Sequence, residues 1–100
     1  MKMQIQGDTL RITEVKELDV ANSKDFRNEA RAALSAAQKN IEIDLSQTML
    51  LDSCGLGTLI SLHKMTSNRN GAVRLLNPTP GIRQILELTR MHRIFEIVKN

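Results

Sequence analysis

The alternation of apolar and polar residues is clearest at residues 41–45, where IEIDL has a period of two and predicts a half-buried strand. A second apolar run, at residues 49–51, follows the polar break Ser46-Gln47-Thr48. The small and polar residues Asp52-Ser53-Cys54-Gly55 then precede a helical pattern, which predicts a helix start with the Ser53 hydroxyl in the capping position. Residues 41–57 therefore read as a strand that leads into a serine at a helix N-terminus.

The same two periodicities predict the other elements of the chain. Further strands are expected at residues 3–6, 10–15, 72–76 and 94–98. Helices are expected at residues 24–38, 55–68 and 80–89, the first behind an N-cap at Asn22 or Ser23 and the last behind Thr79-Pro80. The order β-β-α-β-α-β-α-β predicts one α/β domain over residues 1–100, with a mixed, mostly parallel sheet and helices packed on it.

Composition narrows the possible functions. The chain is 41% hydrophobic and 25% charged, which is ordinary for a globular domain. Its two aromatic residues are both Phe, and this weakens a single-strand or RNA-binding interpretation, because such sites stack bases on aromatic rings. A single cysteine permits no internal disulfide. The N-terminus has no apolar signal core and no run approaches a membrane span, so we expect a cytoplasmic protein.

The formal net charge of +3 is unevenly distributed along the chain. Residues 1–52 contain seven Lys or Arg and nine Asp or Glu, whereas residues 53–100 contain seven and two. The basic residues of the second half are dispersed, with no run of four or more. A solvated basic surface is therefore a better interpretation than a nucleic-acid site.

Ser53 has two possible roles in the local pattern, a plain helix cap or a catalytic nucleophile. The surrounding sequence is not the Gly-x-Ser-x-Gly of a nucleophile elbow. His63 lies ten residues along the same helix, about 15 Å away at 1.5 Å per residue, which is too far to act as a base. His92 could approach only through tertiary folding, and a third orienting group would still be needed. The local pattern alone favours the cap.

The residues around Ser53 do not form a recognised phosphate-binding or metal-binding motif. Cys54 at a helix N-terminus could be a reactive thiol, but a small buried cysteine is the simpler expectation. Gly55 and Gly57 lack the lysine and the spacing of a phosphate-binding loop. The histidines, the cysteine and the acids show no metal-ligand spacing. We therefore predict no metal, no cofactor and no enzymatic activity.

The segment DLSQTMLLDSCGLGTLISLHK closely resembles the signature of STAS domains, the bacterial anti-sigma factor antagonists. In that family an Asp-Leu-Ser strand end is followed by an apolar run, Asp-Ser-Ser-Gly-Leu-Gly and a helix. The resemblance extends over nearly the whole chain and includes Glu17-Leu18-Asp19, residues 71–76, Asn77–Pro80 and Arg93-Ile94-Phe95. Cys54 stands in place of the second serine of the motif, and Ser53 matches the first.

The resemblance implies partner switching. In similar proteins the serine that matches Ser53 is phosphorylated by an anti-sigma factor that is also a serine kinase. The unphosphorylated form binds this kinase and frees the sigma factor, and a serine phosphatase resets the cycle. The chain would then be a kinase substrate and binding module, monomeric when free, that touches neither nucleic acid nor membrane. The alternative is a non-switching STAS subunit of a transport or sensory complex.

The resemblance also implies a set of partner-binding residues. They are Asp19, Asp52, Ser53, Cys54, Leu56 and Gly57, with Ile60 on the same helix. Core packing is the alternative role for Leu56 and Ile60, and for Ile60 it is the favoured one. Asp19 could instead cap a turn.

Overall fold

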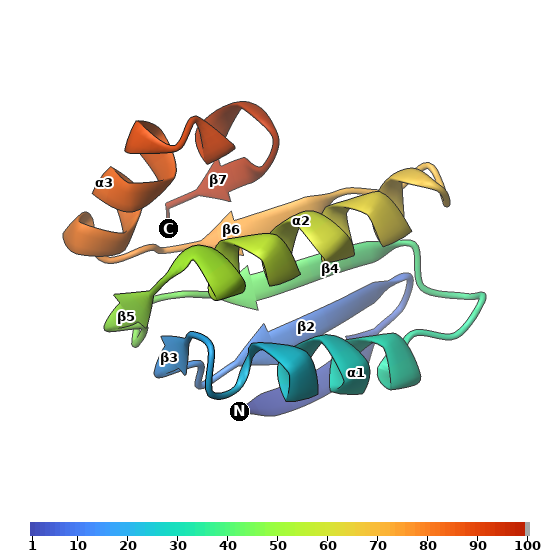
Figure 1. Ribbon diagram of the computed structural model, residues 1–100. Coiled ribbons are helices and arrows are strands. Elements are labelled where there is room, and N and C mark those ends of the chain that lie inside the picture. The colour runs from blue at the N-terminus through green and yellow to red at the C-terminus, as the bar shows by residue number, and fades with distance from the viewer. Residues whose placement is uncertain (100) are drawn as a thin grey trace.

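The computed structural model describes residues 1–99, which are built on a central five-stranded sheet (Figure 1). Its strands lie side by side in the order β1 (Lys2–Gln6), β2 (Thr9–Thr13), β4 (Asn40–Asp44), β6 (Val73–Leu76) and β7 (Glu96–Val98). β1 and β2 are antiparallel and are joined through Gly7, whose φ is 61°, and the other neighbours are parallel. The expected mixed, mostly parallel sheet is confirmed.

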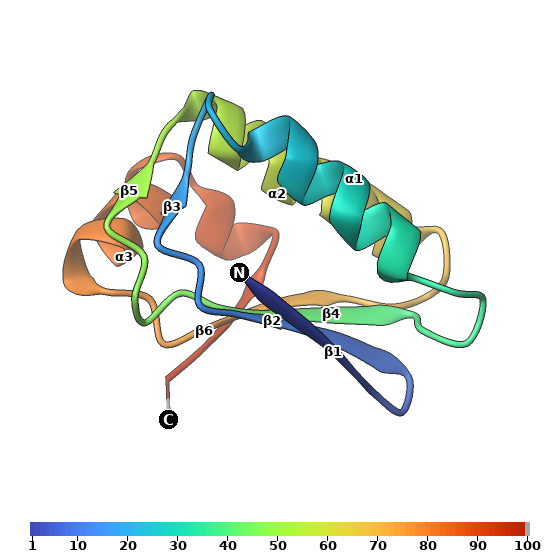
Figure 2. The same ribbon diagram turned by 90° about the horizontal axis from the view of Figure 1, so that it is seen from below.

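The helices pack on one face of this sheet (Figure 2). They are α1 (Ser23–Ala33), α2 (Ser53–Ser67), α3 (Pro80–Leu88) and the short 3-10 helix η1 (Met91–Arg93). The start of α3 is as predicted, because Thr79 Oγ1 accepts from the Ile82 N–H and Pro80 takes the first helical position. None of the helices in residues 1–99 is both long enough and apolar enough to cross a membrane.

The core lies between the sheet and the helices. Alternate strand residues point into it and are at most 2% exposed: Leu10, Ile12, Ile41, Ile43, Val73 and Leu75. The helices contribute Phe26, Ala30, Leu59, Leu62, Ile82 and Leu86 to the same cluster. The strand alternation read from the sequence is thus the alternation between the core and the open face of the sheet.

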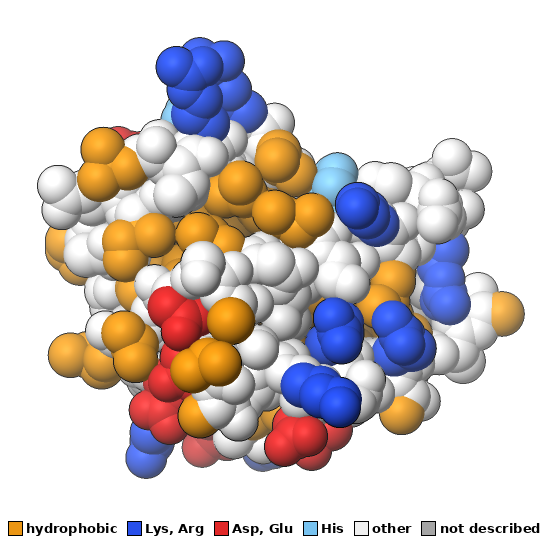
Figure 3. Space-filling view, viewed as in Figure 1, with side chains coloured by type: hydrophobic (Ala, Val, Ile, Leu, Met, Phe, Trp, Pro, Cys, Tyr) orange, Lys and Arg blue, Asp and Glu red, His pale blue; other side chains and the backbone are white. Residues whose placement is uncertain are grey.

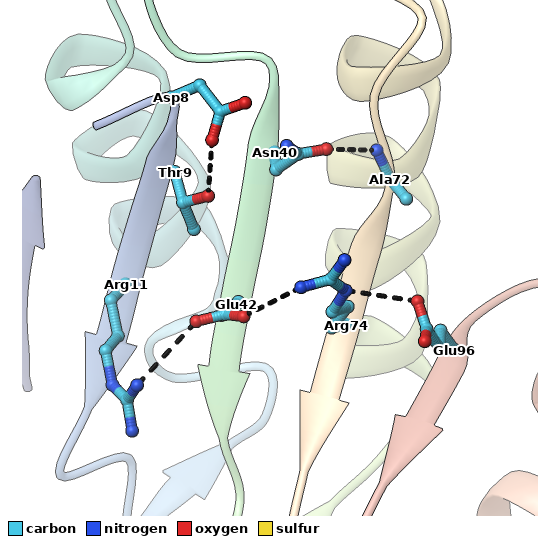
Figure 4. Close-up of polar contacts among 8 residues, drawn as sticks. All are labelled: Asp8, Thr9, Arg11, Asn40, Glu42, Ala72, Arg74 and Glu96. Atoms are coloured by element: carbon cyan, nitrogen blue, oxygen red, sulfur yellow. Dashed lines mark hydrogen bonds and ion pairs between the residues drawn. The ribbon is translucent and has the colours of Figure 1, made fainter. Parts of the chain in front are cut away.

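The open face of the sheet carries a row of alternating charges (Figure 4). Glu42 on β4 accepts from Arg74 on β6 at 3.2 Å and lies 3.7 Å from Arg11 on β2. Arg74 also donates to Glu96 on β7 at 3.1 Å, and this carboxylate, followed by Glu42, raises the pKa of Arg74. Such exposed pairs contribute only about 0–1 kcal/mol each. Their main effect is to keep this face polar.

A strand that the sequence pattern did not indicate lies between the expected strand at residues 10–15 and the expected helix at residues 24–38. Two-residue strands β3 (Glu17–Leu18) and β5 (Leu50–Leu51) pair in parallel and form a second, small sheet. Neither segment is long enough to show a periodicity, and they pair across a long stretch of chain. Its second strand, β5, ends directly before the start of α2.

The first helix is shorter than predicted, because α1 ends at Ala33 rather than at residue 38. Gln38 is 6% exposed, and its Oε1 accepts from the N–H and the hydroxyl of Ser35. Arg69 donates to the carbonyl oxygens of both Ser35 and Gln38, at 2.7 and 2.8 Å. These bonds hold residues 34–39 as a compact loop in place of the last helical turn.

Two predicted strands are also shorter in the structure. β2 ends at Thr13 because Glu14 takes a left-handed conformation with φ 58°, although Val15 beyond it is still buried. Ile94 and Phe95 precede β7 in the turn after η1, and Phe95 reaches the core at 3% exposure. The strand conformation predicted for both segments was not confirmed: Val15 and Phe95 are buried, whereas Ile94 is 40% exposed.

Candidate functional site

The start of α2 differs from the prediction in one important respect. Asp52, not Ser53, is the N-cap: its Oδ1 accepts from the Gly55 N–H at 2.9 Å. Ser53 is the first helical residue and is exposed. An aspartate satisfies a free N–H of the first turn and also places negative charge at the positive end of the helix dipole. The predicted capping role of the Ser53 hydroxyl is therefore wrong.

Asp52 also joins the helix to a distant loop. Its second oxygen, Oδ2, accepts from the Val20 N–H at 3.0 Å, and its own N–H donates to the Leu18 carbonyl at 3.3 Å. The Gly55 N–H, followed by the Val20 N–H, holds the pKa of the Asp52 carboxyl below its usual value. Asp52 is thus an ionised clamp between the first turn of α2 and residues 19–22.

The loop at residues 19–22 is closed by its own side chains. Asp19 Oδ1 accepts from the Ala21 N–H at 3.0 Å, so Asp19 does cap a turn. Asn22 Oδ1 accepts from the Asp19 N–H, and its Nδ2 donates to the Glu17 carbonyl at 2.7 Å. Asn22 therefore precedes α1 without capping it by a side-chain bond, in contrast to the prediction. The folded loop rests against the Asp52 carboxylate and so places Asp19 close to the start of α2.

One face of α2 carries the exposed part of the candidate site. Ser53, Gly57 and Ile60 are spaced i, i+4 and i+7 and share this face, which points away from the buried Leu59 and Leu62. Ser53 and Gly57 are exposed, and Ile60 is half-buried. The favoured core role of Ile60 is therefore wrong, because the helix turns it toward the surface.

Cys54 and Leu56, which lie beside this face, differ in burial. Cys54 is exposed, so the expectation of a buried cysteine is wrong. The tight contact of α2 with β3 is made by Gly55 instead, where an added Cβ would meet the Leu18 backbone. Leu56 is half-buried and packs against the core. Leu56 therefore has a packing role in addition to its predicted place in the interface.

Exposed apolar side chains surround the start of α2, and their exposure was not expected from the sequence. Val20 is 73% exposed, Leu50 on β5 is 50% exposed and Met49 before it is 83% exposed. Figure 3 shows apolar side chains beside acidic ones over β5 and the start of α2. Met49 and Leu50 belong to the apolar run noted in the sequence, and Val20 directly follows Asp19. Exposed apolar groups of this kind are typical of protein-interaction surfaces.

The histidine of α2 is used in packing. The His63 ring lies edge-on to the Phe95 ring, with 5.8 Å between centroids, and its Nε2 is 3.5 Å from the Ser67 hydroxyl. Within residues 1–99, no group of three His, Cys, Asp or Glu side chains is placed to hold a metal ion. The geometry around Ser53 is that of an exposed hydroxyl on a rigid helix start.

A family model for the STAS domain matches residues 1–100. The chain belongs to the STAS family. It is 29% identical over 97 residues to a STAS-domain containing protein of Pseudomonas aeruginosa, covering 97% of this chain and 86% of the relative. It is 25% identical over 85 residues to the anti-sigma F factor antagonist of Paenibacillus polymyxa, covering 84% of this chain and 73% of the relative.

Solved structures show the same fold. A Thermotoga maritima protein assigned as an anti-sigma factor antagonist superimposes with a TM-score of 0.91 at 25% identity, covering 99% of this STAS domain and 86% of that chain. The antagonist SpoIIAA, at 20% identity, matches in its unphosphorylated form with a TM-score of 0.82 and in its phosphorylated form with 0.74. Each match covers 96% of this chain. It covers 85% of the unphosphorylated SpoIIAA chain and 88% of the phosphorylated one. A match to the murine anion transporter Slc26a9 covers 85% of this chain and 14% of the transporter chain, with a TM-score of 0.71 and 19% identity.

Proposed function

We propose that this STAS domain is an anti-sigma factor antagonist that acts by partner switching in the cytoplasm. Its unphosphorylated form binds an anti-sigma factor that is also a serine kinase, and the sigma factor is released. Phosphorylation of Ser53 abolishes this binding, and a serine phosphatase restores it. The interface would include Ser53 and the residues around it: Asp19, Asp52, Cys54, Leu56 and Gly57.

The availability of the Ser53 hydroxyl carries this proposal. Ser53 is exposed, and its hydroxyl makes no hydrogen bond within residues 1–99. The capping bond of α2 is made by the Asp52 carboxylate instead. A kinase could therefore modify the hydroxyl without breaking a bond that the fold requires. The helix cap would remain intact in both states.

The charge at this position explains why phosphorylation would act as a switch. A phosphate adds about −1.5 to −2 charges at neutral pH. It would stand next to the ionised Asp52 carboxylate and beside the exposed Val20 and Leu50. A partner that packs on these apolar groups would have to strip water from the phosphate. A coupling of about 1–3 kcal/mol changes affinity by about 5- to 150-fold, which is enough for a switch.

The relatives support the same interpretation. The Paenibacillus polymyxa relative is an anti-sigma F factor antagonist, and SpoIIAA, which shares the fold, exists in phosphorylated and unphosphorylated forms. Both forms superimpose on this chain, in keeping with a switch that leaves the fold unchanged.

Phosphorylation with a kinase-type anti-sigma factor and ATP tests the proposal. The wild type should be labelled on Ser53, and Ser53→Ala should remove the label while keeping partner binding. Ser53→Asp should weaken binding about 5- to 150-fold. Ser67→Ala, a second exposed serine on α2, is the matched control and should change neither result. Undiminished labelling of Ser53→Ala would refute the assignment.

A structural role in a larger complex is the second candidate. The same fold forms 14% of the Slc26a9 anion transporter chain, so a STAS domain can be one part of a transport protein. In that case the chain should co-purify stably with a transport or sensory complex, and Ser53→Asp should leave the association unchanged. This result separates the two candidates.

A further inference from the structure

Helix α1 carries opposite charges on two of its sides. Lys24, Arg27 and Arg31 are spaced i, i+3 and i+7 and form one line along the helix, called here the cationic stripe. Asp25 and Glu29 are spaced i, i+4 and form a second line about a third of a turn away. Figure 3 shows Lys and Arg side chains gathered over α1.

The two lines face different surroundings. Asp25 and Glu29 line a hollow together with Glu14 and Glu17 at the β1 side of α1. On its other side α1 packs along α2, where the Thr58 hydroxyl donates to the Ser23 carbonyl at 3.2 Å. The cationic stripe therefore lies on the outer surface of the α1–α2 pair, and the acidic side lies away from α2.

The cationic stripe has no acidic partner within residues 1–99. The ion pairs of this part of the chain join Arg11, Arg74 and Arg83 to glutamates, and none includes Lys24, Arg27 or Arg31. Arg27 is half-buried, and its Nε is shielded from solvent with no acceptor. The charge of Arg27 is thus not compensated by an acceptor within residues 1–99, and an incoming carboxylate would compensate it through the terminal nitrogens of the same guanidinium.

The dimensions of the stripe favour a narrow acidic ligand. Residues 24–31 span about 10 Å of helix at 1.5 Å per residue. Two carboxylates spaced i and i+7 on a partner helix lie the same distance apart, so they could reach both ends of the stripe. Guanidinium groups bind carboxylates through paired hydrogen bonds. A broad anionic surface, such as duplex DNA or a membrane, needs a wide basic face, whereas the stripe is one row of side chains wide and the same helix carries Asp25 and Glu29. Both aromatic side chains, Phe26 and Phe95, are buried and offer no stacking surface for single strands.

We propose that the cationic stripe binds an acidic segment of a partner protein, at a surface distinct from the Ser53 site. The occupant is a helix or short segment with Asp or Glu at i, i+3 or i+4, and i+7. This binding does not depend on the phosphorylation state of Ser53, and it goes beyond the proposed function.

A titration followed by amide NMR chemical shifts tests this proposal on the full chain. The probe is a synthetic helical peptide with Glu at i, i+4 and i+7 of one face, and the matched peptide has Gln at the same positions. The Glu peptide should shift the amides of residues 24–31 most. The combined change Lys24→Gln, Arg27→Gln and Arg31→Gln should weaken its binding by about tenfold or more.

A variant with the same loss of charge controls for net charge. It combines Lys2→Gln, Lys39→Gln and Arg93→Gln, three exposed basic residues elsewhere, and should bind the Glu peptide as the wild type does. Equal binding of both peptides, no binding of the Glu peptide, or equal weakening in both variants would overturn the proposal. Tighter, stripe-dependent binding of phosphatidylserine vesicles or a DNA duplex would also overturn it. Ser53→Asp should leave peptide binding unchanged, so this test and that of partner switching can fail separately.

Discussion

Alanine at Gly55 and alanine at Gly57 should change the stability of the domain in opposite directions. Both glycines lie in the first two turns of α2, and alanine has the higher helix propensity at both, by about 1 kcal/mol. The difference between them is in the surroundings. Gly55 is buried against the small sheet, whereas Gly57 is exposed.

A Cβ at position 55 would have no space. It would collide with the Leu18 carbonyl, whose carbon would lie 2.8 Å away, and with Leu51 Cδ1 at 2.9 Å. The Leu18 carbonyl cannot easily move, because it accepts from the Asp52 N–H and belongs to the β3–β5 pair. Overpacking of this kind costs about 1–3 kcal/mol, and a rigid backbone places Gly55→Ala near the upper end. After the gain in propensity, we expect a net loss of about 2 kcal/mol.

A Cβ at position 57 would meet nothing within 4 Å. Gly57→Ala should therefore raise the free energy of unfolding by about 0.5–1 kcal/mol. For a domain of this size, 1 kcal/mol corresponds to about 4–8 °C in Tm. The two variants should thus melt on opposite sides of the wild type.

Urea unfolding followed by far-ultraviolet circular dichroism measures both effects in parallel. The slope of the free energy against urea should stay constant, so that the midpoints report stability directly. If Gly55→Ala were as stable as the wild type, the close approach of α2 to β3 would not limit this position and the reasoning would be refuted. Gly57→Ala also separates stability from binding, since a partner that contacts Gly57 should bind the more stable variant less well.

Two further changes test the contacts around the site. Asp52→Asn should destabilise the domain most at pH values above the usual Asp pKa of about 4, and the difference from wild type in urea unfolding should shrink below it. The reason is that the lowered pKa of Asp52 stabilises the fold only while the carboxylate is ionised. Thr48→Val should lower the free energy of guanidinium unfolding by about 1–3 kcal/mol, because the fully buried Thr48 hydroxyl donates to the Val15 carbonyl. Thr48→Ser, which keeps the hydroxyl, should be less destabilising. A pH-independent effect of Asp52→Asn, or a neutral Thr48→Val, would contradict these assignments.

The sequence predicted the parts of the fold that depend on local patterns. The alternation at residues 41–45 placed Ile41 and Ile43 in the core, where both are fully buried. Thr79 and Pro80 indicated the start of α3. In each case the residue type itself restricts the backbone or the side that is buried, so neighbours along the chain were enough.

The details of the candidate site could not be predicted in the same way. Ser53 and Asp52 are adjacent and both suit a helix cap, but Asp52 also reaches the Val20 N–H of a loop far away in the sequence. Cys54 was expected to be buried, and the rotation of α2 that exposes it is set by the contact of Gly55 with Leu18. These outcomes depend on how α2 lies against the small sheet.

The sequence by itself determined the order of the main-sheet strands and the three α-helices, the family resemblance and the position of Ser53 at the start of a helix. Only the tertiary structure decided that Asp52 caps this helix and leaves the Ser53 hydroxyl without a hydrogen bond within residues 1–99. It also placed the stripe of Lys24, Arg27 and Arg31, which follows from helical spacing alone, on the outer surface of the α1–α2 pair. Periodicity and residue type act over a few neighbouring residues, whereas a shared carboxylate or a charged surface depends on which distant segments the packed core brings together.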